Sequence, residues 1–141
     1  MAAVTVPDLR VHVDAVLAAL RAGLPSSYTV TEAVGPSDPA VTVPYVVLYA
    51  DLGTPGGYPF CPGRDLDVTI SLRGVGESAD QAQKAASRAR TIMLSGGIAV
   101  TGRALKIYQD TAAPPPVERD ATITPPLFQQ LVIFDLCSRP A

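Results

Sequence analysis

Side chains that commonly carry chemistry are scarce in this sequence of 141 residues. It has no tryptophan, a single histidine (His12) and two cysteines (Cys61 and Cys137), which lie far apart and outside any CxxC arrangement. Metal sites need clusters of such side chains, so we expect no metal site and two reduced thiols. The sequence has no GxSxG, P-loop or HExxH motif, and the glycines of residues 53–57 precede no helix that could hold a phosphate. We therefore expect no cofactor and no enzymatic activity.

Charge is also sparse, since charged residues make up 17% of the chain and the formal net charge is −2. A nearly balanced chain has no general attraction to nucleic acid, and the basic group Lys84, Arg88 and Arg90 is typical of a solvated helix face. No apolar run approaches the roughly 18 residues that a membrane span needs. The first ten residues include Asp8 and lack the basic region of a signal peptide, so we expect synthesis and folding in a cytoplasm.

The most strongly patterned stretch is residues 65–94. Its first part alternates apolar and polar side chains, which predicts a strand with one buried face. Gly74 and Gly76 predict a tight turn at the end of this strand. Ser78 offers an N-cap with Gln81 as its capping-box partner, and an alanine-rich apolar stripe follows at helical spacing. We expect this strand-turn-helix unit to form the core.

A second helix is expected near the N-terminus. Thr5 is predicted to be its N-cap and Pro7 to lie in its first turn, where a missing N–H costs nothing. Leucines and valines then recur at helical spacing until about Ala22, and Gly23 provides a C-terminal stop. His12 is expected on the solvent-facing side of this helix.

The remaining patterned stretches predict strands. They are residues 28–34, 44–49, 103–110 and 128–137, with a short strand expected at 98–100. Together the elements predict an α+β fold: a mixed, largely antiparallel sheet of four or five strands with two helices packed on one face, in a single domain spanning residues 1–141. The opposite face would be wet, covered by loops or paired with a neighbour, and the sparse charge favours the neighbour.

Two long irregular stretches interrupt the pattern, residues 51–64 and 111–126. The first is dense in glycine and proline and carries the aromatic residues Tyr58 and Phe60. Aromatic side chains on a long loop are typical of docking into a partner, but they could equally fold back over the open end of the core. The second contains three consecutive prolines, which favour an extended path.

The order of these elements resembles a known family. An N-terminal helix, two strands separated by an open loop, the unit DVTISLRGVGESADQAQKAASRARTIML and two closing strands, the first ending in Tyr108, Gln109 and Asp110, resemble the tail terminator and head–tail joining proteins of long-tailed phages. The resemblance covers most of the chain and is one of pattern and length. It implies a structural role: a six-fold ring that caps the tail tube, ends its polymerisation and offers a surface for head joining.

The same resemblance implies the partners. They are further copies of the chain in a hexamer, the tail tube protein and the head–tail connector, with no membrane and no specific nucleic-acid binding, although the genome would pass through the ring. The protein would be a minor tail protein at the neck end of the virion tail. We expect the two long stretches to carry the contacts, with Tyr58, Phe60, Arg64 and Arg119 as the candidate contact residues.

Two other functions remain open. One is a small ferredoxin-like ligand-binding module or enzyme subunit, with its ligand under the loop that carries Tyr58 and Phe60. The other is a different neck or minor tail component of the same virion. A binding module predicts a concave pocket and a smaller oligomer, whereas a tail terminator predicts a closed ring.

Overall fold

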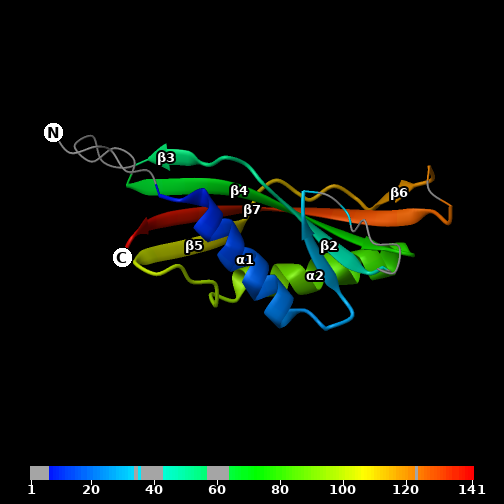
Figure 1. Ribbon diagram of the computed structural model, residues 1–141. Coiled ribbons are helices and arrows are strands. Elements are labelled where there is room, and N and C mark those ends of the chain that lie inside the picture. Colours follow the sequence, from blue (N-terminus) through cyan, green and yellow to red (C-terminus); the bar gives the residue numbers. More distant parts are fainter. Residues whose placement is uncertain (1–6, 34, 36–42, 57–63, 123) are drawn as a thin grey trace.

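The computed structural model describes residues 7–33, 35, 43–56, 64–122 and 124–141. Its elements are two helices and seven strands (Figure 1). In chain order they are α1 (Leu9–Gly23), β1 (Thr29–Glu32), β2 (Tyr45–Ala50), β3 (Thr54–Gly56), β4 (Asp65–Gly76), α2 (Ala79–Leu94), β5 (Arg103–Gln109), β6 (Glu118–Asp120) and β7 (Leu127–Pro140).

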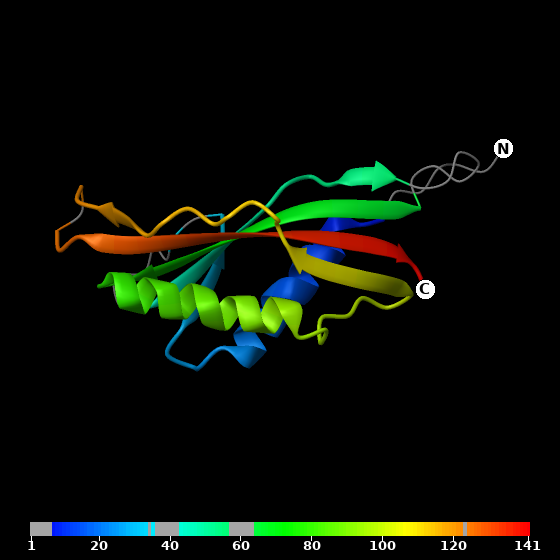
Figure 2. The same ribbon diagram turned by 180° about the vertical axis from the view of Figure 1, so that it is seen from behind.

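The strands form one mixed sheet in the order β1-β2-β4-β7-β5, with β3 beside the start of β4 and β6 beside the start of β7. β1 and β2 are parallel, and the other strand pairs of the described sheet are antiparallel. β4 and β7 are the longest strands and pair from Leu66 opposite Ser138 to Gly76 opposite Phe128. Both helices cover the same face of the sheet (Figures 1 and 2). The predicted α+β fold is therefore confirmed.

Three details of the strand prediction were wrong. Residues 54–56 and 118–120 were expected to be irregular but form β3 and β6, because they run beside β4 and β7 and share their hydrogen-bonding edges. Conversely, residues 98–100 form no strand. The buried side chain of Ile98 joins the core cluster from this connecting segment without pairing its backbone to the sheet.

The two helices begin with side-chain caps. The Ser78 hydroxyl accepts a hydrogen bond from Gln81 N at 3.2 Å, and the Gln81 side chain accepts one from Glu77 N at 2.6 Å, so the predicted cap of α2 is confirmed. α1 is capped differently from the prediction. Its N-cap is Asp8, whose carboxylate accepts from Arg10 N at 2.8 Å, and Pro7 therefore precedes the helix. Thr5 lies outside the described residues.

The glycines at the end of β4 have a different role from the one expected. Gly74 lies inside the strand and Gly76 is its last residue, and both pair with β7, so the turn into α2 is made by Glu77 and Ser78. A Cβ at Gly74 would lie 2.7 Å from the backbone of Ala82 and Ala86. A Cβ at Gly76 would lie 2.7 Å from Ala82 N. These two glycines let the backbone of α2 approach β4 closely, and the small side chains of the alanine stripe allow the same approach from the helix.

The core lies between the helices and one face of the sheet. Alternate residues of the central strands point into it, as the period of two predicts. The fully buried strand side chains include Leu48, Ile70, Leu72, Phe134 and Leu136. They pack against α1 and against the alanine stripe of α2, so the strand-turn-helix unit does lie at the centre of the fold.

Candidate interaction surface

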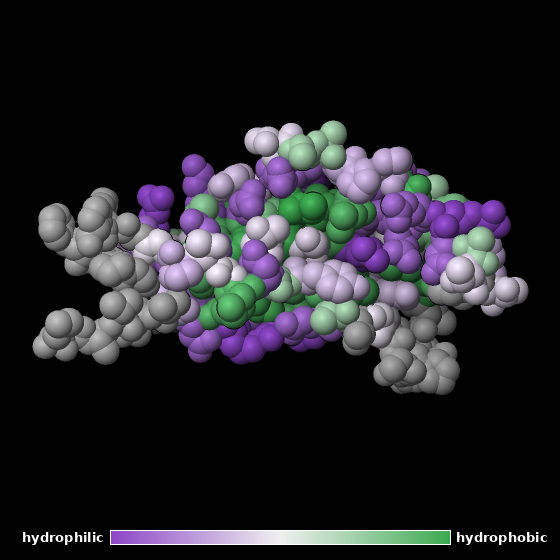
Figure 3. Space-filling model, turned by 90° about the horizontal axis from the view of Figure 1, so that it is seen from above, coloured by the Kyte–Doolittle hydropathy of each residue, from purple (hydrophilic) through white to green (hydrophobic). Residues whose placement is uncertain are grey.

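The sheet face opposite the helices is uncovered by any described helix (Figures 1 and 3). We call this surface the open face. It is built by the residues that alternate with the core positions: Tyr45, Val47 and Tyr49 of β2, Thr69, Ser71 and Arg73 of β4, Leu131, Ile133, Asp135 and Cys137 of β7, and Lys106 and Tyr108 of β5. Figure 3 looks onto it and shows apolar side chains gathered between hydrophilic ones.

The open face mixes apolar, aromatic and polar side chains, because the central strand β4 contributes polar residues and its neighbours contribute apolar and aromatic ones. Leu131 and Ile133 are half-buried, whereas Tyr49 keeps 36% and Tyr108 42% of its surface exposed. The Arg73 guanidinium lies 5.6 Å from the centre of the Tyr49 ring, which is a cation–π distance. Tyrosine and arginine side chains are enriched in protein contact surfaces.

Cys137 lies toward one end of the open face. Cys137 is a free thiol on β7, and its Sγ donates to Tyr108 Oη at 3.9 Å. Burial raises the pKa of the Cys137 thiol, and a hydrogen bond with Asp67 raises it further. The thiolate is the nucleophilic form, so this cysteine is held in its unreactive state near neutral pH. Cys61 lies outside the described residues.

The candidate contact residues lie at opposite ends of the sheet. Arg64 is exposed and directly precedes β4, whereas Arg119 is exposed on β6 opposite Phe128, beside the end of β4. A strand of twelve residues separates the two ends, which corresponds to about 36 Å at the usual rise per residue. The structure therefore does not bring Arg64 and Arg119 together. Tyr58 and Phe60 lie outside the described residues.

Arg64 lines a pocket of about 330 Å³ at its end of the molecule, which we call the end pocket. The pocket is formed where α1 begins, β5 begins and β7 ends. Its lining includes Asp8, Val11, His12, Arg64, Arg103 and Pro140. Sequence reasoning placed Arg64 among the contact residues but missed Arg103, because nothing in the local pattern of β5 distinguishes it from a solvated strand residue.

A buried hydrogen-bond network lies next to the end pocket. His12 is 3% exposed and Ser138 is fully buried, so the expectation of a solvent-facing histidine was wrong. His12 Nε2 lies 2.7 Å from Ser138 Oγ, and His12 Nδ1 lies 2.6 Å from the carbonyl oxygen of Asp8. Arg103 donates from Nε to Ser138 Oγ at 2.9 Å. The network ties α1, β5 and β7 together.

The partners of His12 fix which ring nitrogen carries the proton. The Asp8 carbonyl can only accept, so Nδ1–H donates to it and Nε2 accepts from the Ser138 hydroxyl. Ser138 Oγ also accepts a hydrogen bond from Arg103, and Ser138 has no exposed surface. A hydroxyl held in this way cannot reach a substrate, so the histidine–serine contact stabilises the fold.

We expect Ser138→Ala to lower the free energy of unfolding by about 1–3 kcal/mol, because it leaves His12 Nε2 buried without a partner. Ser87→Ala on the exposed side of α2 serves as the matched control and is expected to change stability by less than about 0.5 kcal/mol. Urea unfolding followed by circular dichroism measures both. Equal midpoints for the two variants would contradict a stabilising role for the network.

No protein-family profile matches the chain, and no curated protein is significantly similar to it. Within the described ranges, no group of three or more His, Cys, Asp or Glu side chains could hold a metal ion. Neither of the two helices described is long and apolar enough to cross a membrane.

Proposed function

We propose that this protein is a structural component of a phage tail that forms a ring on the end of the tail tube, ends its polymerisation and provides the surface for head joining. The observation that carries the proposal is the open face. One side of a long sheet carries both helices, and the other side leaves Tyr49, Tyr108 and half-buried Leu131 and Ile133 accessible.

Ring formation places particular demands on a subunit. Each copy must present two different surfaces that fit each other, because rings form through heterologous (head-to-tail) contacts. The molecule offers an open face with accessible tyrosines and two chemically different ends, at Arg64 and at β6. These features support subunit contacts and a separate surface for the tube, with further copies of the chain, the tail tube protein and the head connector as partners. The protein would then reside at the neck end of the virion tail.

A ligand-binding module is the second candidate, and one observation favours it. A pocket of about 480 Å³ lies on the open face, lined by Ala104, Leu105, Lys106, Tyr108, Cys137 and Arg139. Its volume falls within the range typical of small-molecule sites. However, these side chains belong to two neighbouring strands of one sheet, so the pocket is a shallow depression and not an enclosed site.

The test uses headless tail tubes of the phage that encodes the protein. The wild-type protein is expected to bind one end of each tube as a ring, visible by negative-stain electron microscopy, and to stop further addition of tube protein. Ile133→Lys on the open face is expected to abolish capping while circular dichroism stays unchanged, because it places a charge beside Leu131 on the surface proposed for contacts.

Gln83→Lys is the matched control, since it adds the same charge to the exposed side of α2. It is expected to cap tubes as the wild type does. Tubes that grow equally with and without the wild-type protein would contradict the proposed function, and would leave the ligand-binding module as the better explanation.

A further inference from the structure

The end pocket holds an arginine charge that makes no ion pair with a described residue, although the Asp8 carboxylate lines the same pocket. Arg103 is half-buried and rigidly placed: its Nε donates to Ser138 Oγ at 2.9 Å, and its Nη2 donates to the carbonyl oxygens of Arg64 at 2.7 Å and Ser138 at 3.0 Å. All three acceptors are neutral. Among the described residues no carboxylate lies within 4.0 Å of the guanidinium of Arg103 or Arg64. A partly buried cation of this kind is stabilised by an anion that pairs with it.

The acidic residues near the pocket already have other partners. The Asp8 carboxylate accepts from Arg10 N as the cap of α1, at 2.8 Å. Asp65, next in sequence to Arg64, lies 3.8 Å from Arg139. Arg103 Nη1 makes no hydrogen bond within the part of the chain that the structure describes, and the pocket beside it is lined partly by Val11, which is 46% exposed. The pocket therefore fits a carboxylate that is presented on a protein surface.

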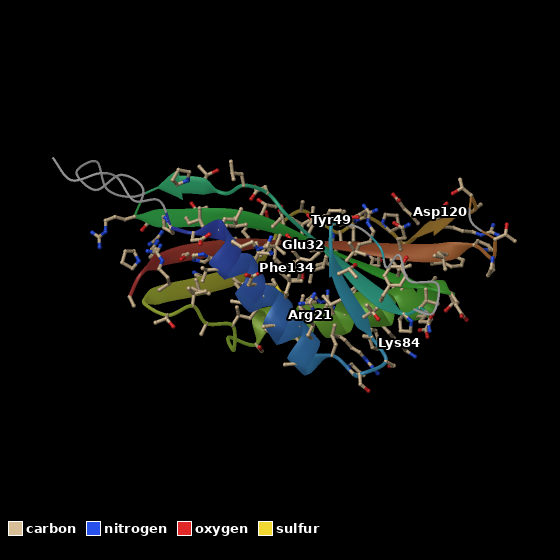
Figure 4. The ribbon with its side chains drawn as sticks, viewed as in Figure 1. Arg21, Glu32, Tyr49, Lys84, Asp120 and Phe134 are labelled. Carbon is tan, nitrogen blue, oxygen red and sulfur yellow. The ribbon has the colours of Figure 1, made fainter. Side chains whose placement is uncertain are left out.

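The opposite end of the molecule carries two carboxylates that form no ion pair with a described residue, although Lys84 lines a pocket with Glu77 and Arg73 lines one with Glu118. Glu77 follows β4 and Glu118 begins β6, and both are exposed. Neither forms an ion pair with any described residue, whereas the neighbouring Asp80 pairs with Lys84 at 3.0 Å. Glu118 pairs with Gln129 and Arg119 with Phe128, so alternation directs the two charges to opposite sides of β6. Figure 4 locates this end by Asp120, the last residue of β6.

We propose that the end pocket of one copy receives Glu118 from a second copy of the same chain, in a head-to-tail contact to which Glu77 at the same end of the sheet adds negative charge. Unpaired arginines at one end and unpaired carboxylates at the other are complementary in charge. Because the two ends lie about 36 Å apart on one copy, they cannot neutralise each other within it. The contact is heterologous, and this inference rests on the proposed ring by naming the surfaces that would close it.

The test uses two variants that each remove one side of the contact. Arg64→Glu reverses the charge at the pocket, and its side chain makes no hydrogen bond within the described structure, so the fold is retained. Glu77→Lys with Glu118→Lys reverses the charges at the opposite end. Each variant alone is expected to lose the assembled species in native mass spectrometry, with self-association weakened about a hundredfold or more.

Mixing the two variants distinguishes this contact from any symmetrical one. Arg64→Glu keeps wild-type carboxylates and the double variant keeps a wild-type pocket, so these two ends can meet in the mixture. The reversed charges of the two variants are also opposite in sign and can meet each other, so assembly is expected to return only when the variants are mixed. Arg90→Glu on the exposed side of α2 is the matched control and is expected to assemble as the wild type does.

Two results would overturn the inference. In one, both variants assemble as the wild type does; the ring could then still form through other surfaces, and the proposed function would be unaffected. In the other, the variants are monomeric and their mixture stays monomeric, which would show that the two ends do not meet. Capping of tail tubes by the wild type tests the proposed function separately.

Discussion

Gly74→Ala is expected to lower the free energy of unfolding by about 3 kcal/mol, the upper part of the usual range for overpacking. The added Cβ would lie 2.7 Å from Ala82 O and Ala86 N, and both are backbone atoms of α2 that cannot rotate away. Either α2 must move off the sheet or β4 must bend. A loss of this size is a large fraction of the stability of a typical domain.

Gly97→Ala provides the control for the intrinsic effect of a glycine substitution. A Cβ there would meet only Ser95 Oγ at 3.6 Å, an ordinary contact, so a change within about 1 kcal/mol is expected. Urea denaturation of the two variants compares them directly. A Gly74→Ala protein with the wild-type midpoint would mean that α2 does not pack against β4 as closely as the structure has it.

Phe134→Ala is expected to cost about 3–5 kcal/mol, the usual range when a large side chain is removed from a core. Phe134 has no exposed surface and lies between the middle of β7 and the helices (Figure 4). Its neighbours belong to several elements, so they cannot all move inward to fill the cavity.

Phe128→Ala is the matched control, because Phe128 lies near the start of the same strand and is only half-buried. It is expected to lose less than half as much stability. The urea midpoint should fall much further for Phe134→Ala while the slope of the transition stays the same, which would show that both variants unfold as one unit. Equal losses would indicate that the core is not centred on Phe134.

The alternation in residues 65–72 and the alanine stripe of α2 were sufficient to predict the centre of the fold. Both patterns are local, and burial on one face is what generates them. Gly74 and Gly76 were misinterpreted for a physical reason. A glycine that relieves a close helix–strand approach and a glycine that permits a turn look alike in a sequence, and only the position of α2 distinguishes them.

The network around His12 could not be predicted from the sequence. His12 and Ser138 are 126 positions apart, and no periodic signal links a helix near one end of the chain to a strand near the other. His12 lies one position before the buried Val13, so the helical pattern alone leaves it at the edge of the apolar stripe. Only the position of β7 beneath α1 brings the imidazole into the interior.

The candidate contact residues were predicted from loop composition, and their role in contacts stays a prediction. Arg64 and Arg119 are exposed but lie at opposite ends of the sheet, so they belong to two separate surfaces. Arg103, which also lines the end pocket, lies in a regular strand, and no feature of the sequence indicated a role for it. The open face followed directly from the predicted fold, because two helices on one side of a sheet leave the other side uncovered.

The mass of the wild-type protein in solution, measured by native mass spectrometry across a range of concentrations, tests ring formation most directly. A closed species of about six subunits that does not grow further at higher concentration is predicted, because a heterologous contact that closes leaves no unpaired end. A protein that stays monomeric at every concentration, or that stops at a two-fold dimer, would contradict the head-to-tail contact between the end pocket and Glu118.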